Sequence, residues 1–478
     1  MVLIFVFWRE NLVSSNLKPL KPIMCVRPPN DIIYDPSFWD ELSDGGINEV
    51  VLQWLCLLDD QGSEEGNVYP QQEDEHPRGL QIFDGKRVNR VPVAAYEPNL
   101  MLYEGFSWRP PNMPHHLSDE SNKLKKALEI GRSKGFSIYV MDDKGYFRLG
   151  NFGSGRLTNP KIPSFTDPES IAMTVTRIRD TVTNFPQISG VFLDGPDFKW
   201  EIKPAHRDNI WSEPIDTPEN RRFAHSHGIN FKEILTGRNY FNDFLHEFNP
   251  DYARRFISET PGALASHVWW NNHPILAAWY RFKQLSIEWS IETSYKGIKN
   301  YLPHINVSNS SRLPFADPLT GHNPSRKRNY IDFQQPKQYW WSGGVAGFRG
   351  TIMNWVDTLV DWNDELDIDL ASALFESMFD YKMPNNYRVT SYGAEAPDTW
   401  FTTSVRDQTA KMIAGAGGPH LCHPWVGLEH FGSNWLTSSE LHRLLHEMQH
   451  QGLTRYCYFV YNSIDSEIWN VIRSFSED

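Results

Sequence analysis

The stretch Gly190-Val-Phe-Leu-Asp-Gly-Pro-Asp-Phe198 joins a short apolar run to a carboxylate and a sharp turn. A continuous apolar run of this length is typical of a parallel strand that is buried on both faces. Gly195 and Pro196 turn the chain directly after Asp194, which ends the strand and leaves the carboxylate at its carboxyl end. Similar runs alternate with amphipathic helical patterns along the chain, as expected of repeated βα units.

Eight segments are predicted as strands. They are Ile23–Val26, Val50–Leu58, Ser137–Met141, Gly190–Leu193, Arg255–Ser258 and Tyr456–Val460, with Ile305–Val307 and Arg388–Thr390 as weaker candidates. Apolar residues at helical spacing predict helices around Phe38–Leu42, over 118–135, after Thr166 and after Thr437. About eight strands alternating with helices predict an α/β fold, a (β/α)8 TIM barrel with long loop insertions. We expect one catalytic domain over residues 1–478.

Composition narrows the partners of the chain. Its 478 residues carry a formal net charge of −13, which argues against nucleic acid or an anionic membrane as partner. No apolar run reaches 18 residues, so no membrane span is predicted. The four cysteines form no CxxC pair, so we expect buried thiols. The sequence contains no phosphate-binding glycine motif, and we therefore expect no cofactor. The opening MVLIFVFW fits an export signal poorly, so the sequence does not assign a compartment. It does not indicate an oligomeric state either.

Carboxylates follow three of the predicted strands, at Asp142, Asp194 and Glu259. The carboxyl ends of parallel barrel strands meet at one rim, so these groups are expected to converge on one pocket. Two carboxylates at one site can break an acetal, one protonating the leaving oxygen and the other attacking the anomeric carbon or activating water. We therefore expect Asp194 and Glu259 to be a catalytic pair. The alternatives are a turn-capping Asp194 and a Glu259 that pairs with Arg254 or Arg255.

Aromatic residues are numerous, with 18 Trp, 19 Tyr and 28 Phe, and they either fill a large core or stack on sugar rings. Rings scattered over several loops favour an endo-acting enzyme that holds a long chain. Glu395 is a rival nucleophile, and His225 with His227 lack a third ligand, so no metal site is predicted. The candidate substrate-binding residues are Arg27, His116, Asp142, Asp197, Trp200, Trp269, Trp270, Asn271, Trp355, Tyr392, Glu395, His423 and Trp425.

The motifs GVFLDGPDF (190–198) and FISETPG (256–262) resemble those of retaining (β/α)8-barrel glycoside hydrolases, most closely the endo-α-1,3-fucanases that act on sulfated fucans. The resemblance implies Asp194 as nucleophile, Glu259 as acid/base, an anionic polysaccharide substrate and a secreted or periplasmic setting. Arg27, His116 and His423 are the expected sulfate contacts. Two alternatives stay open: a barrel glycosidase on another polysaccharide, and a catalytically inactive barrel that binds carbohydrate.

Overall fold

Eight parallel strands form a nearly closed barrel in the computed structural model, which describes residues 17–26, 30–53, 55–59, 82–83, 86–87, 91–107, 109–110, 112–143, 165–206, 209–339, 348–383, 396–427, 437–461 and 464–477. In order around the barrel they are β1 (Lys21–Val26), β2 (Glu49–Leu52), β7 (Ser137–Asp143), β8 (Ile188–Asp194), β9 (Asn306–Ser311), β10 (Phe333–Pro336), β11 (Trp425–Gly427) and β12 (Arg455–Phe459). Parallel bridges from Gln334 to Cys422 and from Lys337 to Trp425 join β10 to β11. The predicted (β/α)8 barrel is confirmed.

Five predicted strands, at Ile23–Val26, Ser137–Met141, Gly190–Leu193, Ile305–Val307 and Tyr456–Val460, coincide with β1, β7, β8, β9 and β12. The run Val50–Leu58 is not one strand. Its first part is β2, and β3 (Cys56–Asp59) instead pairs antiparallel with β6 (Val91–Ala94), inside the long insertion that follows β2. β10 and β11 were not predicted, and Arg388–Thr390 lies outside the described residues.

The strand predicted at Arg255–Ser258 is wrong, because this segment is the second half of the helix α6 (Pro250–Glu259). The side chain of Asn249 accepts a hydrogen bond of 2.9 Å from the backbone N–H of Tyr252, and Pro250 occupies the first turn. Both features are start signals of a helix. Ala253 and Phe256 are buried at helical spacing, so the apolar residues of this segment cover one helix face.

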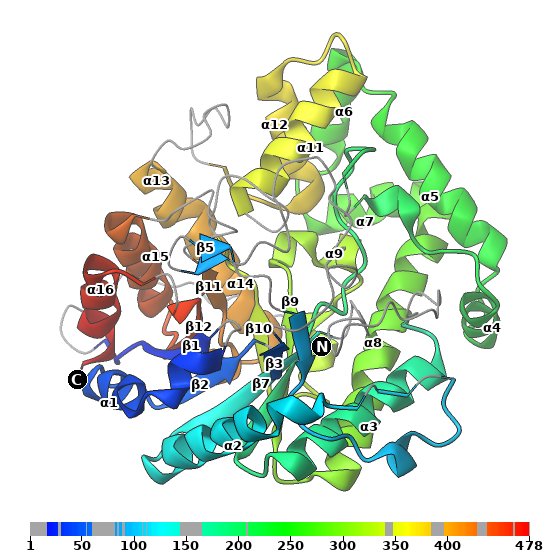
Figure 1. Cartoon of the computed structure of the whole chain (residues 1–478). Helices are drawn as coiled ribbons and strands as arrows, with labels where there is room; N and C mark the ends of the chain where they lie inside the picture. Colours follow the sequence, from blue (N-terminus) through cyan, green and yellow to red (C-terminus); the bar gives the residue numbers. More distant parts are fainter. Residues whose placement is uncertain are drawn as a thin grey trace.

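Helices pack around the barrel strands in Figure 1: α1 (Pro36–Asp44), α2 (Ser118–Ser133), α3 (Pro168–Asn184), α8 (Ile275–Tyr301), α14 (Arg406–Ala416), α15 (Ser438–His450) and α16 (Ser466–Ser476). Of these, α1, α2, α3 and α15 lie where helices were predicted, whereas α8, α14 and α16 were not predicted. Thr437 and Glu440 form the predicted reciprocal capping box. At the start of α3 the cap is Asp167, one residue after the predicted Thr166, because its carboxylate accepts from the backbone N–H of Glu169.

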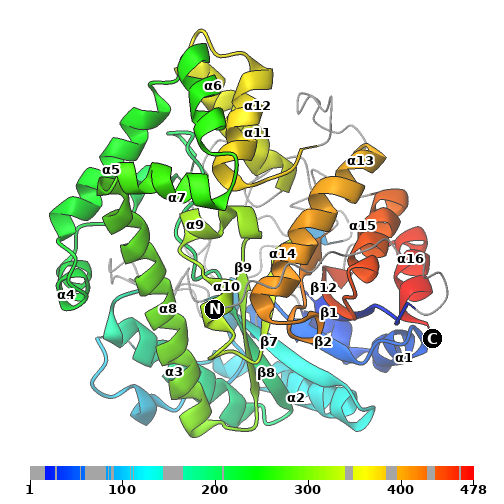
Figure 2. The same ribbon diagram turned by 180° about the vertical axis from the view of Figure 1, so that it is seen from behind.

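A second set of helices lies to one side of the barrel (Figures 1 and 2). It contains α4 (Pro218–Ser226), α5 (Phe231–Leu245), α6, α7 (Ala263–Asn272), α11 (Phe348–Trp362) and α12 (Ile368–Phe379). The amide of Asn363 donates a 3.0 Å hydrogen bond to the carbonyl of Leu245, and His246 stacks on Trp362 at 3.9 Å. These contacts join the insertion after β8 to the insertion after β10.

Short elements complete the chain: η1 (Asn30–Tyr34), β4 (Ile82–Phe83), β5 (Lys86–Arg87), η3 (Leu100–Tyr103), η4 (His115–Leu117), η6 (Ile210–Ser212), η7 (Pro314–Ala316), α9 (Asp317–Thr320), α10 (Pro324–Lys327), α13 (Asp398–Trp400), η8 (Phe401–Val405) and η9 (Pro419–Leu421). None of the helices in the described part of the chain has both the length and the apolar character needed to cross a membrane.

The interior of the barrel is partly polar. Ser308 donates a 2.6 Å hydrogen bond to the side chain of Gln335, which in turn donates to the Sγ of Cys457 at 2.9 Å. The indole N–H of Trp425 donates to the hydroxyl of Ser310 at 3.1 Å. These buried polar groups satisfy one another across the barrel, as burial requires. The described cysteines Cys25, Cys422 and Cys457 are buried free thiols.

Lys283, on α8, is a buried amine among aromatic rings. Its Nζ lies 4.4 Å from the ring centroid of Trp279 and 5.8 Å from that of Phe198. Burial lowers the pKa of Lys283 to about 7, although the charge of Glu213 acts in the opposite direction. The charged amine is therefore less stable in the folded protein than in the unfolded chain, where its pKa has the ordinary value of 10.5.

We expect Lys283→Met to raise the free energy of unfolding at neutral pH by on the order of 3 kcal/mol. Because the folded-state pKa lies below the unfolded value, the wild type loses stability as the pH falls from about 10 to about 7. The gain from the variant should therefore be largest below about pH 7 and disappear above about pH 10. Denaturant unfolding across this range measures it, with the exposed Lys296→Met on α8 as control. A variant no more stable than the wild type at pH 7 would contradict the burial cost.

Candidate active site

Asp194 is the last residue of β8 and lies at the carboxyl end of the fourth barrel strand, as predicted. Its side chain is 20 % exposed, and Lys337, which directly follows β10, places its Nζ 2.6 Å from the Oδ1 of Asp194. The amine itself is nearly buried, with 8 % of the side chain exposed. A carboxylate that solvent reaches is thus held in an ion pair between two strand ends. Asp194 therefore lies at the end of the barrel where active sites of (β/α)8 enzymes are built.

Asp197 lies in the turn after β8 and is buried in a charged network. Arg312, the residue after β9, places its Nε 3.2 Å from one carboxylate oxygen, and His322 contacts the other at 2.5 Å. Burial alone would raise the pKa of Asp197, but Arg312 and the hydrogen bond from His322 outweigh it and hold the pKa well below its usual range. The ring of Trp200 packs 3.8 Å from the guanidinium of Arg312. Asp197 therefore orients other protein groups.

The protonation of His322 follows from its two partners. The Nζ of Lys327 lies 3.0 Å from Nδ1 and can only donate, so Nδ1 accepts and Nε2 carries the hydrogen that is donated to Asp197. Burial and the charge of Lys327 lower the pKa of His322 to about 4, which agrees with this neutral form. Lys327 also donates to the side chain of Asn309 on β9 at 3.2 Å. The network thus connects the turn after β8 to the barrel wall.

The end of β7 supplies two further acidic residues. Asp142 forms an ion pair with Arg177 on α3, and both side chains are about nine-tenths buried. Asp142 is therefore engaged with the helix layer, which disfavours its predicted role in substrate binding. Asp143 is the Cα register partner of Asp194 in the β7–β8 pair. Neighbouring strands lie about 4.8 Å apart, so the backbone register brings Asp143 close to Asp194.

Several aromatic residues predicted as sugar platforms are part of the core. Trp200, Trp355 and Trp425 are at most 2 % exposed. The indole of Trp355 donates a 2.9 Å hydrogen bond to the carbonyl of Trp200, and Trp425 fills the barrel interior against Phe192 and Phe459. Fully buried rings cannot stack on a substrate, so these three predictions are corrected. The aromatic content is largely explained by packing.

His423 is also corrected. It lies before β11, where its backbone N–H donates to the carbonyl of Gln334, three residues before Lys337 on the neighbouring strand. Its ring packs 4.4 Å from that of Phe333, and burial lowers its pKa to about 4. His423 is therefore a neutral, buried group inside the fold and not an anion contact at the rim.

Glu259 is the last residue of α6 and is exposed to solvent. It ends a helix of the lateral layer, which is the second set of helices beside the barrel, so the strand context from which its pairing with Asp194 was expected is wrong. Trp269 and Asn271 lie on α7 in the same layer. Trp269 is buried against Phe244 and Phe256, whereas Trp270 is 38 % exposed.

We expect Glu259→Gln to leave turnover within about twofold of the wild type, because an exposed surface substitution away from a site changes little. The measurement is the initial rate on any substrate that the wild type cleaves. A fall in rate comparable to that of an Asp194 variant would restore Glu259 to the catalytic pair.

Four other residues were predicted to bind the substrate. Arg27, Tyr392 and Glu395 lie outside the described residues. His116 belongs to η4 and is exposed next to the start of α2. Nothing in its surroundings identifies a ligand.

Sequence reasoning missed most of the groups that contact Asp194 or belong to the network around Asp197. Lys337, Arg312, His322, Lys327 and Asn309 stand in polar stretches without apolar strand patterns. Position offered a signal for Arg312, because it directly follows β9, part of which was predicted at Ile305–Val307. Lys337 directly follows β10, which was not predicted.

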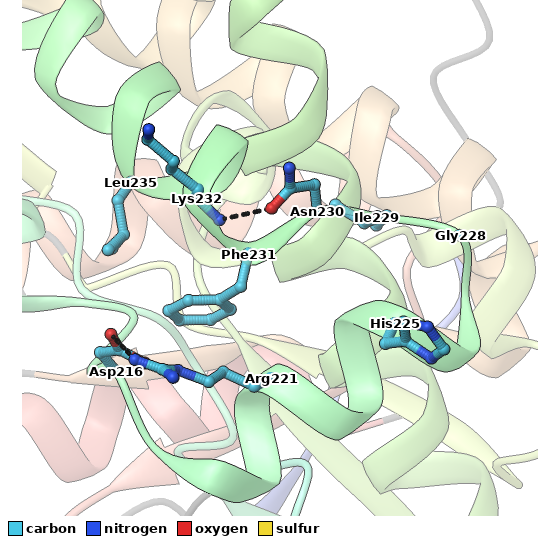
Figure 3. Close-up of a pocket in the computed structure, with 9 residues that line it drawn as sticks. All are labelled: Asp216, Arg221, His225, Gly228, Ile229, Asn230, Phe231, Lys232 and Leu235. Atoms are coloured by element: carbon cyan, nitrogen blue, oxygen red, sulfur yellow. Dashed lines mark hydrogen bonds and ion pairs between the residues drawn. The ribbon is translucent and has the colours of Figure 1, made fainter.

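A surface cavity of about 700 Å³ lies away from the barrel strands, between α4 and the start of α5 (Figure 3). Phe231 and Leu235 line it beside Arg221 and His225. Arg221 is held by Asp216 through hydrogen bonds of 2.5 and 2.7 Å. The cavity contains none of the groups that surround Asp194.

The described residues contain no group of three or more His, Cys, Asp or Glu that could hold a metal ion.

No family model and no curated protein matches the chain. Solved structures similar to it include the glycoside hydrolase domain of PgaB (BpsB) from Bordetella bronchiseptica, with 12 % identity over 96 % of this chain and 99 % of that one and a TM-score of 0.46. A β-galactosidase from Halorubrum lacusprofundi has 11 % identity, a TM-score of 0.46 and coverage of 96 % and 57 %, so the chain spans little more than half of that protein. A chitinase from Rhizomucor miehei has 9 % identity, a TM-score of 0.38 and coverage of 96 % and 100 %. Similarity at this level assigns no activity to the chain.

Proposed function

We propose that the chain is a glycoside hydrolase that cleaves a polysaccharide at the carboxyl end of the barrel. The observation that carries this proposal is the Asp194–Lys337 ion pair of 2.6 Å at the ends of β8 and β10, with the carboxylate still reachable by solvent. Active sites of (β/α)8 barrels are built at this end. A carboxylate held next to an amine suits attack on an anomeric carbon or on water.

Asp194 is the nucleophile in this proposal. Its carboxylate oxygen attacks the anomeric carbon, the glycosidic bond breaks, and a second acid gives its proton to the leaving oxygen. Water then hydrolyses the glycosyl ester with the second residue acting as base, so the anomeric configuration is retained. We assign the second role to Asp143 in place of Glu259, on the strength of its register pairing with Asp194. Asp143→Asn should then lower turnover strongly, while azide should restore part of the rate.

Lys337 is expected to act through Asp194. We expect Lys337→Met to lower kcat by about 10²-fold while KM changes little, because a fixed charge beside the reacting group is lost but the sugar contacts remain. Steady-state kinetics measures the split. Lys337→Arg, which keeps the charge, should recover part of kcat. An unchanged kcat in Lys337→Met would separate the ion pair from the chemistry.

The substrate class is tested by a panel of polysaccharides: sulfated fucan, galactan and mannan. Release of reducing ends on any of them supports the hydrolase, and an early fall in polymer size would indicate endo action. Release of single sugars with no early fall in size would indicate exo action. Binding without any release of reducing ends would favour the inactive carbohydrate-binding barrel.

An anionic, sulfated-fucan-like substrate is the finer form of the proposal. Supporting it is the positive charge at this end of the barrel, where Lys337 lies beside Asp194 and Arg312 beside Asp197. Charge-assisted hydrogen bonds to sulfate are the expected mode of recognition. The test compares kcat/KM on one fucan before and after chemical desulfation. Equal values would leave the hydrolase in place and remove the sulfate preference.

A further inference from the structure

Three histidines form a line along α15. His442, His446 and His450 are four residues apart, so they lie on one helix face, and all three are exposed. The ring centroids of His446 and His450 are 4.6 Å apart with planes at 62°. Those of His442 and His446 are 6.3 Å apart with planes at 15°. The two neighbouring pairs therefore differ in geometry although their sequence spacing is the same.

We propose that His446 and His450 form a two-ligand binding site for a late first-row divalent cation such as Cu²⁺, Ni²⁺ or Zn²⁺. Imidazole nitrogens bind such ions at about 2.0–2.1 Å, which puts two rings that share one ion roughly 4.5–5 Å apart between centroids. The 4.6 Å separation of these two rings falls in this range. The 6.3 Å separation of His442 and His446 does not.

The local electrostatics favour the neutral imidazole that a metal requires. Burial and the neighbouring His450 lower the pKa of His446, and His442 and Arg406 act in the same direction, whereas Glu447 opposes them. Arg406 on α14 forms an ion pair with Glu447 at 2.9 Å. The carboxylate of Glu447 is thus engaged next to the site, and water is left to complete the coordination sphere.

The helix holds the two rings on a rigid support. Its opposite face is buried through Leu441, Leu444, Leu445 and Met448. The capping box at Thr437 and Glu440 fixes its first turn. The ring of His442 packs 5.2 Å from that of Phe475 on α16, which separates it from the other two. A site on a packed helix is positioned in advance, so less conformational freedom is lost when the ion binds.

Isothermal titration of the untagged full chain with NiCl2, ZnCl2 and glycine-buffered CuCl2 tests the site. We expect Cu²⁺ to bind most tightly, following the general order of affinities for nitrogen ligands. His446→Gln and His450→Gln should each weaken binding by about tenfold or more, whereas the matched control His442→Gln should leave it unchanged. Acidification should release the ion, because a protonated imidazole nitrogen cannot bind a metal.

The same variants can also contradict the proposal. Binding that survives in both His446→Gln and His450→Gln would place the ion elsewhere on the chain. Loss in His442→Gln with retention in His450→Gln would assign it to the other pair. Circular dichroism of each variant separates a lost ligand from a lost helix. None of these outcomes depends on hydrolase activity, so the two proposals fail independently.

Discussion

Asp194→Asn is expected to lower turnover by about 10³-fold or more while the fold is kept, because the amide cannot form the glycosyl ester. The side chain keeps its shape and its oxygen can still face the amine of Lys337, so the barrel end should remain intact. Initial rates of reducing-end release measure the effect, and thermal unfolding shows whether the variant is folded. Glu259→Gln, which removes an exposed charge in the lateral helix layer, is the matched control.

A folded Asp194→Asn variant with wild-type turnover would show that another group carries the chemistry. A folded variant with low turnover next to an active Glu259→Gln would locate the reaction at the end of β8. Loss of activity in both folded variants would restore Glu259 to the catalytic pair.

Asp197→Ala is expected to destabilise the protein by about 3–5 kcal/mol, because it leaves the buried charge of Arg312 without its partner. His322 would also lose the acceptor for its Nε2 hydrogen. Denaturant unfolding measures the change. Asp216→Ala is the control, since Asp216 pairs with Arg221 on the surface and such pairs contribute at most about 1 kcal/mol.

A double variant separates the charge from the packing. Replacing a buried ion pair by apolar residues of similar size is often nearly neutral, so Asp197→Leu with Arg312→Met should recover much of the stability lost in Asp197→Ala. Asp197→Ala with unchanged stability but weakened substrate binding would contradict this account and return Asp197 to the substrate contacts predicted from sequence.

Most of the barrel could be predicted because most strands are apolar on both faces. The exceptions have a physical cause. β10 reads Phe-Gln-Gln-Pro, and both glutamines are buried with hydrogen-bond partners: Gln335 bonds to Ser308 and Cys457, and Gln334 donates to the carbonyl of Pro324. No local pattern reveals partners that distant. The opposite error occurred at residues 255–258, where two apolar positions, Phe256 and Ile257, suggested a strand although Asn249 and Pro250 already indicated a helix start.

The site was predictable only in part. Asp194 could be located because a strand and its turn are local features of GVFLDGPDF. Lys337 could not, since it lies 143 positions further on and meets Asp194 only through the closure of the barrel. The predicted exposure of Trp200, Trp355 and Trp425 was wrong for a related reason, since all three stand in polar sequence. Their burial is made possible by distant partners: the indoles of Trp355 and Trp425 donate hydrogen bonds, and Trp200 stacks on Arg312.

The central claim is that the Asp194 carboxylate attacks an anomeric carbon. The most direct test incubates Asp194→Gly with an activated aryl glycoside, of a sugar that the wild type is found to cleave, in the presence and absence of azide. Azide should take the place of the missing carboxylate, expel the phenol and form a glycosyl azide of inverted configuration, which mass spectrometry and NMR identify. Restored phenol release together with this product is the result we predict. Absence of any glycosyl azide from a folded variant, with the wild type active on the same glycoside, would contradict the assignment of Asp194 as the nucleophile.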